Sequence, residues 1–399
     1  MRKFIPILIL FSLAVSSKSE GRGMPVDSVG IEFLGMVSLI PSPGITEHYK
    51  GAIQEKKIID FIDRMDSDIL NSIAASLKKI KNEQSINDWL FYQLIRRTAE
   101  KCINKSDDYV GYTVYKWYLL RSCGYEPLIS ISTDKILLYV KSDDPIYNLP
   151  LKNFHQQQYV CLNYHDYGFN IALDQEKFTN LSEIIQTGAI FSFNIHNIPA
   201  IDKQAYKSKQ INFTYKQKQE QINVLVNPEF SSYFKNYPVT DYQNQFNIPL
   251  SGETYQSLIS SLKQKTNKFT VTEGVEYLMY FTRNAFEYER DTEVFGREKR
   301  LSPEETLLYE KSDCEDRSAL FFYLVKEIYN LPMIVVMYED HVTVAVKLNI
   351  ESKNNIRYKD ESYAICEPTP QTRDLKIGML AKGLEKKPFE ISYAYNPGK

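Results

Sequence analysis

Residues 310–325 read EKSDCEDRSALFFYLV, and this stretch predicts a helix whose first turn carries a reactive side chain. Apolar residues follow from Ala319 at the spacing of a buried helix face. Ser312 or Asp313 can cap the helix, which places Cys314 in its first turn. There the helix dipole and unpaired backbone N–H groups are expected to lower the pKa of the thiol and to favour the nucleophilic thiolate.

The strands predicted downstream carry a histidine and an acid in the same order along the chain. His341 opens the alternating stretch HVTVAV, in which Val342, Val344 and Val346 share one strand face. His341 then belongs to the opposite face, and we expect that face to meet the helix start. Glu367 follows on the next strand, ESYAICEPT.

Together, Cys314, His341 and Glu367 form a candidate thiol triad. The histidine takes the thiol proton, and the carboxylate orients the ring and supports the imidazolium. Glu315 and Asp316 oppose the thiolate electrostatically, which makes an imidazolium partner more important. This chemistry requires no metal and no organic cofactor, and the irregular spacing of the five cysteines does not suggest a zinc site.

The three blocks SDCEDRSALFFYLV, EDHVTVAVKL and AICEPT resemble the bacterial transglutaminase-like superfamily, whose members are relatives of papain-type cysteine peptidases. The resemblance covers roughly residues 255–385. It implies that Cys314 is the nucleophile, His341 the general base and Glu367 the orienting acid. The chain departs from the family pattern in two places: Glu367 stands where Asp is usual, and Val342 follows the histidine in place of the common aromatic residue.

An earlier part of the chain repeats the same order of helix and strands. Residues 105–141 align with residues 311–347 without a gap, and the apolar strand positions agree. The aligned positions of the triad carry Asp108, Lys135 and Leu162. This first copy is therefore expected to keep the fold without the thiol chemistry.

These patterns predict an α+β protein with two transglutaminase-like domains, the first of them degenerate, separated by a small β-rich domain. The expected segments are a signal peptide (1–19), a leader with one strand (20–60), the degenerate domain (61–165), the β-rich middle domain (166–250) and the catalytic domain (251–399).

The N-terminus reads as a secretory signal, because Arg2 and Lys3 precede an apolar run from Phe4 to Val15. Twelve helical residues rise only about 18 Å, which is too short to span a bilayer. The mature chain is expected to be exported, either periplasmic or secreted, and to contain no membrane span. Export favours disulfides, but an odd number of cysteines leaves at least one thiol free.

Composition limits the partners. The formal net charge is -2, from 48 basic and 50 acidic residues without a basic cluster, so a nucleic-acid partner has no electrostatic support. A protein or peptide substrate is expected, with hydrolysis of an amide favoured over cross-linking to an amine. The alternative is a non-catalytic envelope binding or assembly protein. Arg317 is expected to pair with a nearby acid.

Overall fold

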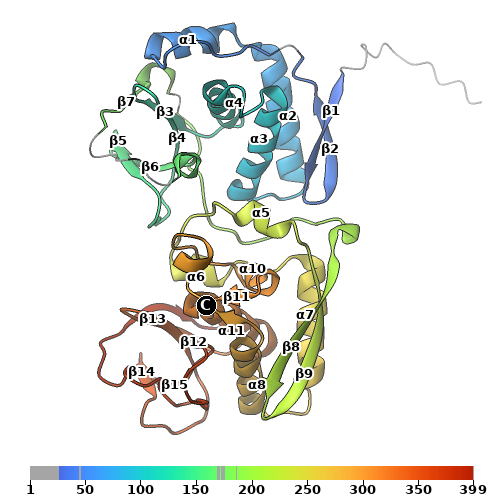
Figure 1. Ribbon diagram of the computed structural model, residues 1–399, viewed down its shortest axis with the longest axis vertical. Helices are drawn as coiled ribbons and strands as arrows, with labels where there is room; N and C mark the ends of the chain where they lie inside the picture. The colour runs from blue at the N-terminus through green and yellow to red at the C-terminus, as the bar shows by residue number, and fades with distance from the viewer. Residues whose placement is uncertain (1–26, 45, 169–170, 172–175, 186, 399) are drawn as a thin grey trace, which may run out of the picture.

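The computed structural model describes residues 27–44, 46–168, 171, 176–185 and 187–398. Figure 1 shows two bodies stacked along the long axis, an N-terminal half in blue and green above a C-terminal half in yellow to red. Each half combines helices with a five-stranded sheet, which confirms the α+β class. The expected signal peptide at 1–19 lies outside the described residues.

The N-terminal half consists of a hairpin, a group of helices and a sheet. Its elements are β1 (Ser28–Phe33), β2 (Met36–Pro41), α1 (Glu55–Arg64), α2 (Ser67–Glu83), α3 (Asp88–Cys102), α4 (Tyr109–Ser122), β3 (Pro127–Ile131), β4 (Ile136–Lys141), β5 (Leu151–Phe154), β6 (Gln157–Cys161) and β7 (Thr179–Asn180).

The C-terminal half starts with a longer hairpin and has additional short elements before its main helix. Its elements are β8 (Lys207–Tyr215), β9 (Lys218–Val226), α5 (Phe230–Phe234), α6 (Tyr242–Phe246), α7 (Gly252–Thr266), α8 (Val271–Asn284), β10 (Glu287–Tyr288), α9 (Asp291–Val294), α10 (Pro303–Leu308), β11 (Lys311–Ser312), α11 (Cys314–Tyr329), β12 (Met333–Tyr338), β13 (His341–Val346), β14 (Ile356–Tyr358), β15 (Glu361–Cys366) and β16 (Glu390–Tyr395).

The two halves share one topology. Their antiparallel sheets have the strand orders β5-β6-β4-β3-β7 and β14-β15-β13-β12-β16, which correspond strand by strand. In both halves a hairpin precedes the helices, and one helix, α4 or α11, leads directly into the sheet. The repeat that the sequence indicates is therefore present in the order of the elements and also includes the two hairpins.

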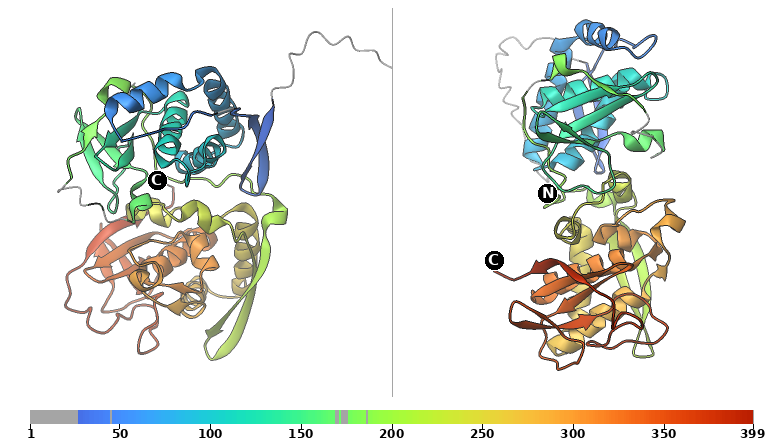
Figure 2. Two further views of the ribbon diagram at one scale, coloured as in Figure 1. Left: turned by 45° about the horizontal axis from the view of Figure 1, so that its top comes forward. Right: turned by 90° about the vertical axis from the view of Figure 1, so that its left-hand side faces the viewer.

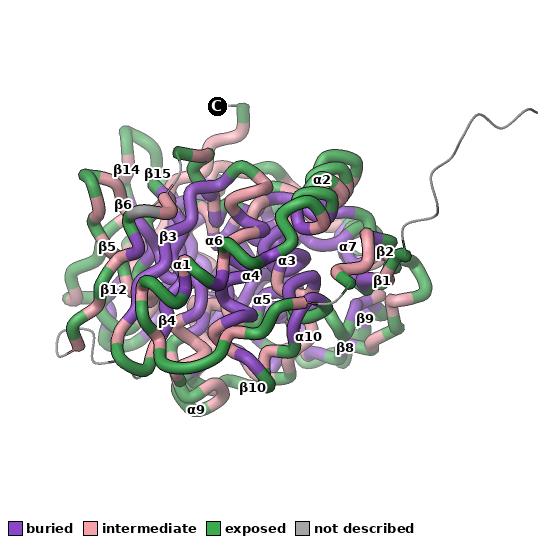
Figure 3. Tube along the Cα trace, turned by 90° about the horizontal axis from the view of Figure 1, so that it is seen from above, coloured by how far each residue is buried: buried purple, intermediate pink, exposed green. Residues whose placement is uncertain are grey.

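Local sequence explains where the helices start and which side they bury. Asp66 caps α2 by accepting hydrogen bonds from the N–H groups of Asp68 and Ile69. The buried residues of α2 recur at helical spacing (Leu70, Ile73, Ala74 and Leu77). Figure 3 shows the outer side of α2 exposed and the tube beneath it buried.

The leader contains two strands, where the sequence suggested one. Residues 28–41 form the hairpin β1–β2, with a turn at Leu34 and Gly35, both of which have positive φ. Glycine adopts this left-handed conformation without a steric penalty, so the chain can reverse inside what looked like one continuous apolar strand.

The segment 166–250 does not form a domain with its own core. Its described residues divide between the two halves: Phe191 and Phe193 pack in the N-terminal core, whereas Phe213 and Val224 pack in the C-terminal core. The hairpin β8–β9 lies along the C-terminal half in both views of Figure 2 and contacts α7 and α8. A two-stranded hairpin has one apolar face to bury, and these helices cover it.

A buried arginine fixes the end of α8 to the start of α11. Arg317 is 0% exposed and donates hydrogen bonds to the main-chain oxygens of Thr282 (3.1 Å), Arg283 (2.7 Å) and Phe286 (2.7 Å). The sequence-based expectation of an acidic partner is therefore wrong. The guanidinium satisfies carbonyl groups that the end of a helix leaves unpaired.

Replacing Arg317 with methionine is expected to lower the free energy of unfolding by roughly 3 kcal/mol or more, because each buried carbonyl left unpaired costs about 1–3 kcal/mol. Urea unfolding measures the difference. Arg64→Met, at an exposed position near the end of α1, is the matched control and should change stability by less than about 0.5 kcal/mol. Equal effects of the two substitutions would contradict the structural role of Arg317.

Candidate active site

Cys314 is the first residue of α11, as the sequence predicts, and it is half-buried. Asp313 is the N-cap, and its carboxylate accepts from the N–H groups of Glu315 (3.0 Å) and Asp316 (3.3 Å). Asp316 reaches back to the N–H of Asp313, which completes a capping box. These bonds fix the first turn of the helix and with it the position of the thiol.

The start of β13 lies directly beside this turn. The main-chain N–H of Val342 hydrogen-bonds the Cys314 side chain, and Ser318, one turn along α11, donates to the carbonyl oxygen of Val342 at 3.0 Å. Strand β15 pairs with β13 only from Val344 to Val346, so Val342 lies outside that pairing. The helix start therefore bonds the part of β13 that β15 leaves free.

The faces of β13 differ from the expectation. Val342, Val344 and Val346 pack in the same core as α11, whereas Ala345 packs in a separate cluster on the other side of the sheet. The helix therefore covers the valine face and not the face assigned to His341. His341 is the first residue of β13, and its ring reaches Glu367, the residue that follows β15.

The ring of His341 is hydrogen-bonded to Glu367. Nε2 of His341 lies 2.8 Å from Oε2 of Glu367, whose side chain is 1% exposed. The other carboxylate oxygen accepts from the N–H of Thr369 at 3.0 Å, and Arg283 donates to the carbonyl oxygen of Glu367. With Nε2–H donating to the carboxylate, Nδ1 remains as the proton acceptor. No hydrogen bond joins the ring to Cys314, although the structure describes both residues.

The ionisation of Cys314 differs from what its place at a helix start predicts, and that of His341 is set by Glu367. Burial raises the pKa of the Cys314 thiol far above its ordinary value, and the charges of Asp313, Glu315 and Glu367 act in the same direction. The resting side chain is therefore a neutral thiol, and the expectation of a lowered pKa is wrong. Burial disfavours the charged form of His341, but the hydrogen bond and charge of Glu367 outweigh it and raise the pKa of the ring.

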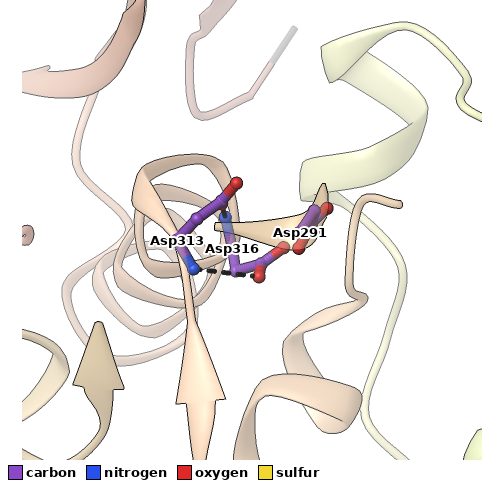
Figure 4. A group of neighbouring side chains, drawn as sticks. All are labelled: Asp291, Asp313 and Asp316. Atoms are coloured by element: carbon purple, nitrogen blue, oxygen red, sulfur yellow. Dashed lines mark hydrogen bonds between the residues drawn. The ribbon is translucent and has the colours of Figure 1, made fainter. Parts of the chain in front are cut away.

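Three carboxyl groups form a cluster beside the cysteine that the sequence analysis did not identify. Side-chain oxygens of Asp291, Asp313 and Asp316 all lie within 4.8 Å of one another, close enough to hold a metal ion (Figure 4). Asp291 accepts from the N–H of Lys299 at 2.8 Å, and Asp316 accepts from the N–H of Leu301 at 2.8 Å. The first bond closes the loop 291–301 on itself, and the second ties the end of this loop to the first turn of α11.

The cluster holds protons near neutral pH. Burial first, and then the charge of Asp313, raises the pKa of Asp291 to about 8. Burial and Glu315 raise the pKa of Asp313 to about 6, and burial with the neighbouring carboxylates raises the pKa of Asp316 well above its ordinary value. Partly protonated carboxyl groups repel one another and the thiol less than three carboxylates would.

A cation and a tyrosine hold the acid next to the cysteine. Arg300 donates to Glu315 (3.0 Å), and Tyr242 donates to the same carboxylate (2.5 Å). The Arg300 guanidinium also lies over the Tyr242 ring, 4.2 Å from its centroid. This contact offsets the charge by which Glu315 was expected to oppose a thiolate. Neither residue has a local sequence signal, because both come from segments distant along the chain.

Three other acids, Asp340, Asp360 and Glu361, lie near the triad along the chain. Asp340 is exposed and pairs with Lys387 at 2.8 Å. Asp360 lies in the turn between β14 and β15, and Glu361 is the first residue of β15. All five cysteines are free thiols, and Cys314 and Cys123 are the two that are not fully buried.

The N-terminal half has a different set of side chains at the corresponding place. Asp108 caps α4 by accepting from the N–H of Gly111 at 2.7 Å, so it corresponds to the cap Asp313 and not to Cys314. Leu162 is buried in the apolar core, and Lys135 forms ion pairs with Glu176 and Asp134. Each of the three aligned positions therefore has a structural contact.

A polar network takes the place of the thiol site in that half. Tyr109, the first residue of α4, donates to Asp166 at 3.0 Å and accepts from the Asn163 amide at 2.8 Å. Lys105 binds the same Asp166 carboxylate at 2.5 Å. By its place in the helix Tyr109 corresponds to Cys314, one residue away from the position given by the sequence alignment.

Comparisons with protein-family models, with curated proteins and with solved structures found no match for this chain. The resemblance to transglutaminase-like proteins therefore depends on the three sequence blocks alone. Among the residues that the structure describes, no helix has both the length and the apolar character needed to cross a membrane.

In the variant Glu367→Gln the pKa of His341 is expected to fall, because burial then acts without the carboxylate of Glu367, which opposes it most strongly. The ring-proton resonances of His341 in an NMR titration measure this pKa, and the chain has only five histidines to assign. An unchanged pKa would show that Glu367 is not the group that supports the imidazolium.

The interaction between His341 and Glu367 makes the free energy of unfolding depend on pH. The folded pKa of His341 is raised, so the stabilisation is complete below the ordinary histidine pKa and is lost as the pH rises through the raised value. The difference in unfolding free energy between the wild type and Glu367→Gln should therefore be larger at about pH 5.5 than at about pH 9.

Proposed function

We propose that this chain is a thiol enzyme of the transglutaminase-like kind that acts on amide bonds of proteins or peptides. The observation that supports it most directly is the 2.8 Å hydrogen bond between His341 and Glu367, beside a helix start that carries Cys314. A histidine held by a buried carboxylate next to a half-buried cysteine is the arrangement that nucleophilic catalysis requires.

In the proposed reaction Nδ1 of His341 takes the thiol proton as Sγ of Cys314 attacks the amide carbonyl. The resulting oxyanion requires a hydrogen-bond donor. Asp313 already occupies the N–H groups of Glu315 and Asp316, whereas no described residue accepts from the N–H of Cys314 itself. We assign that N–H to the oxyanion. His341 then gives its proton to the leaving amine, and a thioester remains on Cys314.

Water completes the reaction that we favour. With His341 as base, water attacks the thioester, releases the acid and restores the thiol, which makes the enzyme a peptidase or amidase. An amine in place of water would give a cross-link by the same steps. Neither route uses a metal or an organic cofactor.

The alternative function is that of a non-catalytic envelope binding or assembly protein. Two observations favour it: the pKa of Cys314 is raised, and its thiol is not hydrogen-bonded to His341. In both functions we propose that residues 1–19 direct export of the chain, to the periplasm or outside the cell.

Reactivity of the cysteine separates the two functions. Iodoacetamide is expected to label Cys314 several-fold faster than Cys123, because only Cys314 has a histidine base at hand. In His341→Ala the rate at Cys314 should fall toward that of Cys123. Mass spectrometry of tryptic peptides gives both rates in one sample.

Cys123→Ser is the matched control and should leave the labelling of Cys314 unchanged. Turnover of a peptide substrate should disappear in Cys314→Ala, and the wild type should form a thioester that hydroxylamine releases. Equal labelling rates at the two cysteines, together with no thioester, would favour the binding protein.

The N-terminal half gives a second prediction. Asp108→Ala should leave activity within a few-fold of the wild type while lowering stability by about 0.5–2 kcal/mol, since it removes a helix cap and no reacting group. Loss of turnover in a folded Asp108→Ala variant would show that the N-terminal half takes part in catalysis.

A further inference from the structure

A polar pocket of ≈ 280 Å³ lies where α3 and α4 meet α5, a short helix whose Phe230, Tyr233 and Phe234 pack in the core of the N-terminal half. Its lining residues are Gln93, Arg96, Arg97, Glu100, Lys105, Tyr112, Ser232 and Tyr233. The pocket is separate from Cys314, and neither the triad nor the proposed mechanism uses any of these side chains.

The pocket has more cationic groups than acids to neutralise them. Arg96 donates to the side-chain oxygen of Gln93 at 2.8 Å, and Arg97 donates to the carbonyl oxygen of Glu32 at 3.0 Å. No carboxylate among the described residues forms an ion pair with either guanidinium. Glu100 is the single acid among the lining residues.

The acid that lies behind the pocket is already bonded. Asp166 accepts from Lys105 at 2.5 Å and from Tyr109 at 3.0 Å. Asp166 therefore pairs with Lys105, and although its charge acts on Arg96, it forms no hydrogen bond or ion pair with Arg96 or Arg97. Guanidinium groups in this state bind carboxylate or phosphate oxygens through charge-assisted hydrogen bonds.

An unpaired donor provides independent support. Gln93 is 4% exposed and lines the pocket, yet its Nε2 has no hydrogen-bond partner among the described residues. A buried amide N–H₂ without an acceptor is costly, so nearly all such groups are paired in folded proteins. The Gln93 amide therefore lacks a hydrogen-bond acceptor. An oxyanion would supply one, and it is also the partner that the two arginines would bind.

A further cation, Lys116, is buried beside the pocket. Lys116 is 1% exposed, and its Nζ lies 4.4 Å from the centroid of the Tyr112 ring. No described carboxylate forms an ion pair with it, and burial lowers its pKa to about 7. An anion in the pocket would favour its charged form.

We propose that this pocket binds a small oxyanion, a carboxylate or a phosphate group, through Arg96, Arg97 and the side-chain amide of Gln93. The N-terminal half is then a ligand-binding half, independent of whether the C-terminal half is an enzyme.

Calorimetric titration of the full chain tests the proposal with sodium phosphate and sodium acetate as probes and sodium chloride at equal ionic strength as the blank. Saturable binding of one probe is expected. Arg96→Gln should weaken it tenfold or more, since about 1.4 kcal/mol per charge-assisted bond corresponds to tenfold. Lys101→Gln, an equal charge change at an exposed position of the same helix, should leave affinity within about twofold.

Gln93→Leu removes the unpaired donor without changing charge and should also weaken binding, so the test does not depend on Arg96→Gln folding. Binding of phosphate alone assigns a phosphate. Binding of acetate, and of a peptide with a free but not an amidated C-terminus, assigns a carboxylate. Absence of saturable binding to the wild type, or equal losses in Arg96→Gln and Lys101→Gln, would overturn the proposal.

Discussion

The candidate site depends on two buried arginines that connect it to the rest of the C-terminal half. Arg317 on α11 donates to the carbonyl oxygen of Arg283 at the end of α8, and the Arg283 side chain donates to the carbonyl oxygen of Glu367. Glu367 in turn binds His341. Cys314, Glu367 and His341 come from distant segments, and this chain of contacts connects all three to the end of α8. Guanidinium groups suit this role, because they have five donors in a rigid plane. Arg317 uses its donors on carbonyls at the end of α8, and Arg283 adds an ion pair with Asp374 at 2.7 Å.

Short sequence patterns predicted those features of the site that are determined by neighbouring residues in the chain. The acid before Cys314 marked a cap, strand alternation placed His341 at a strand start, and the strand ending at Cys366 brought Glu367 next to it. Each of these depends on a few neighbouring residues. The same reasoning gave the order of elements in both halves, since the apolar periodicity of each strand and helix is set by the face that it buries.

The remaining features depend on contacts that no short window contains. Arg317 looked like the partner of an acid because the carbonyls that it binds are some thirty residues earlier in the chain. Asp291 joins Asp313 and Asp316 only after the loop 291–301 folds back. The hairpin β8–β9 has the alternation of a β domain, and only the apolar sides of α7 and α8 assign it to the C-terminal core. Burial of Cys314 reversed the pKa shift that the helix start alone would produce.

The two halves share one topology but gather charges of opposite sign, carboxyl groups in the C-terminal half and cationic side chains in the N-terminal half. In the C-terminal half carboxyl groups gather around the helix start, and they are tolerated there because they hold protons and bond main-chain N–H groups. In the N-terminal half Tyr109 stands at the helix position that Cys314 has in the C-terminal half. The network around Asp166 provides hydrogen bonds for polar groups that would be costly to bury unpaired. Arg96 and Arg97 line a pocket where α3 and α4 meet α5, and none of the residues that line this pocket belongs to the candidate triad, so the two sets of charges are held by separate contacts.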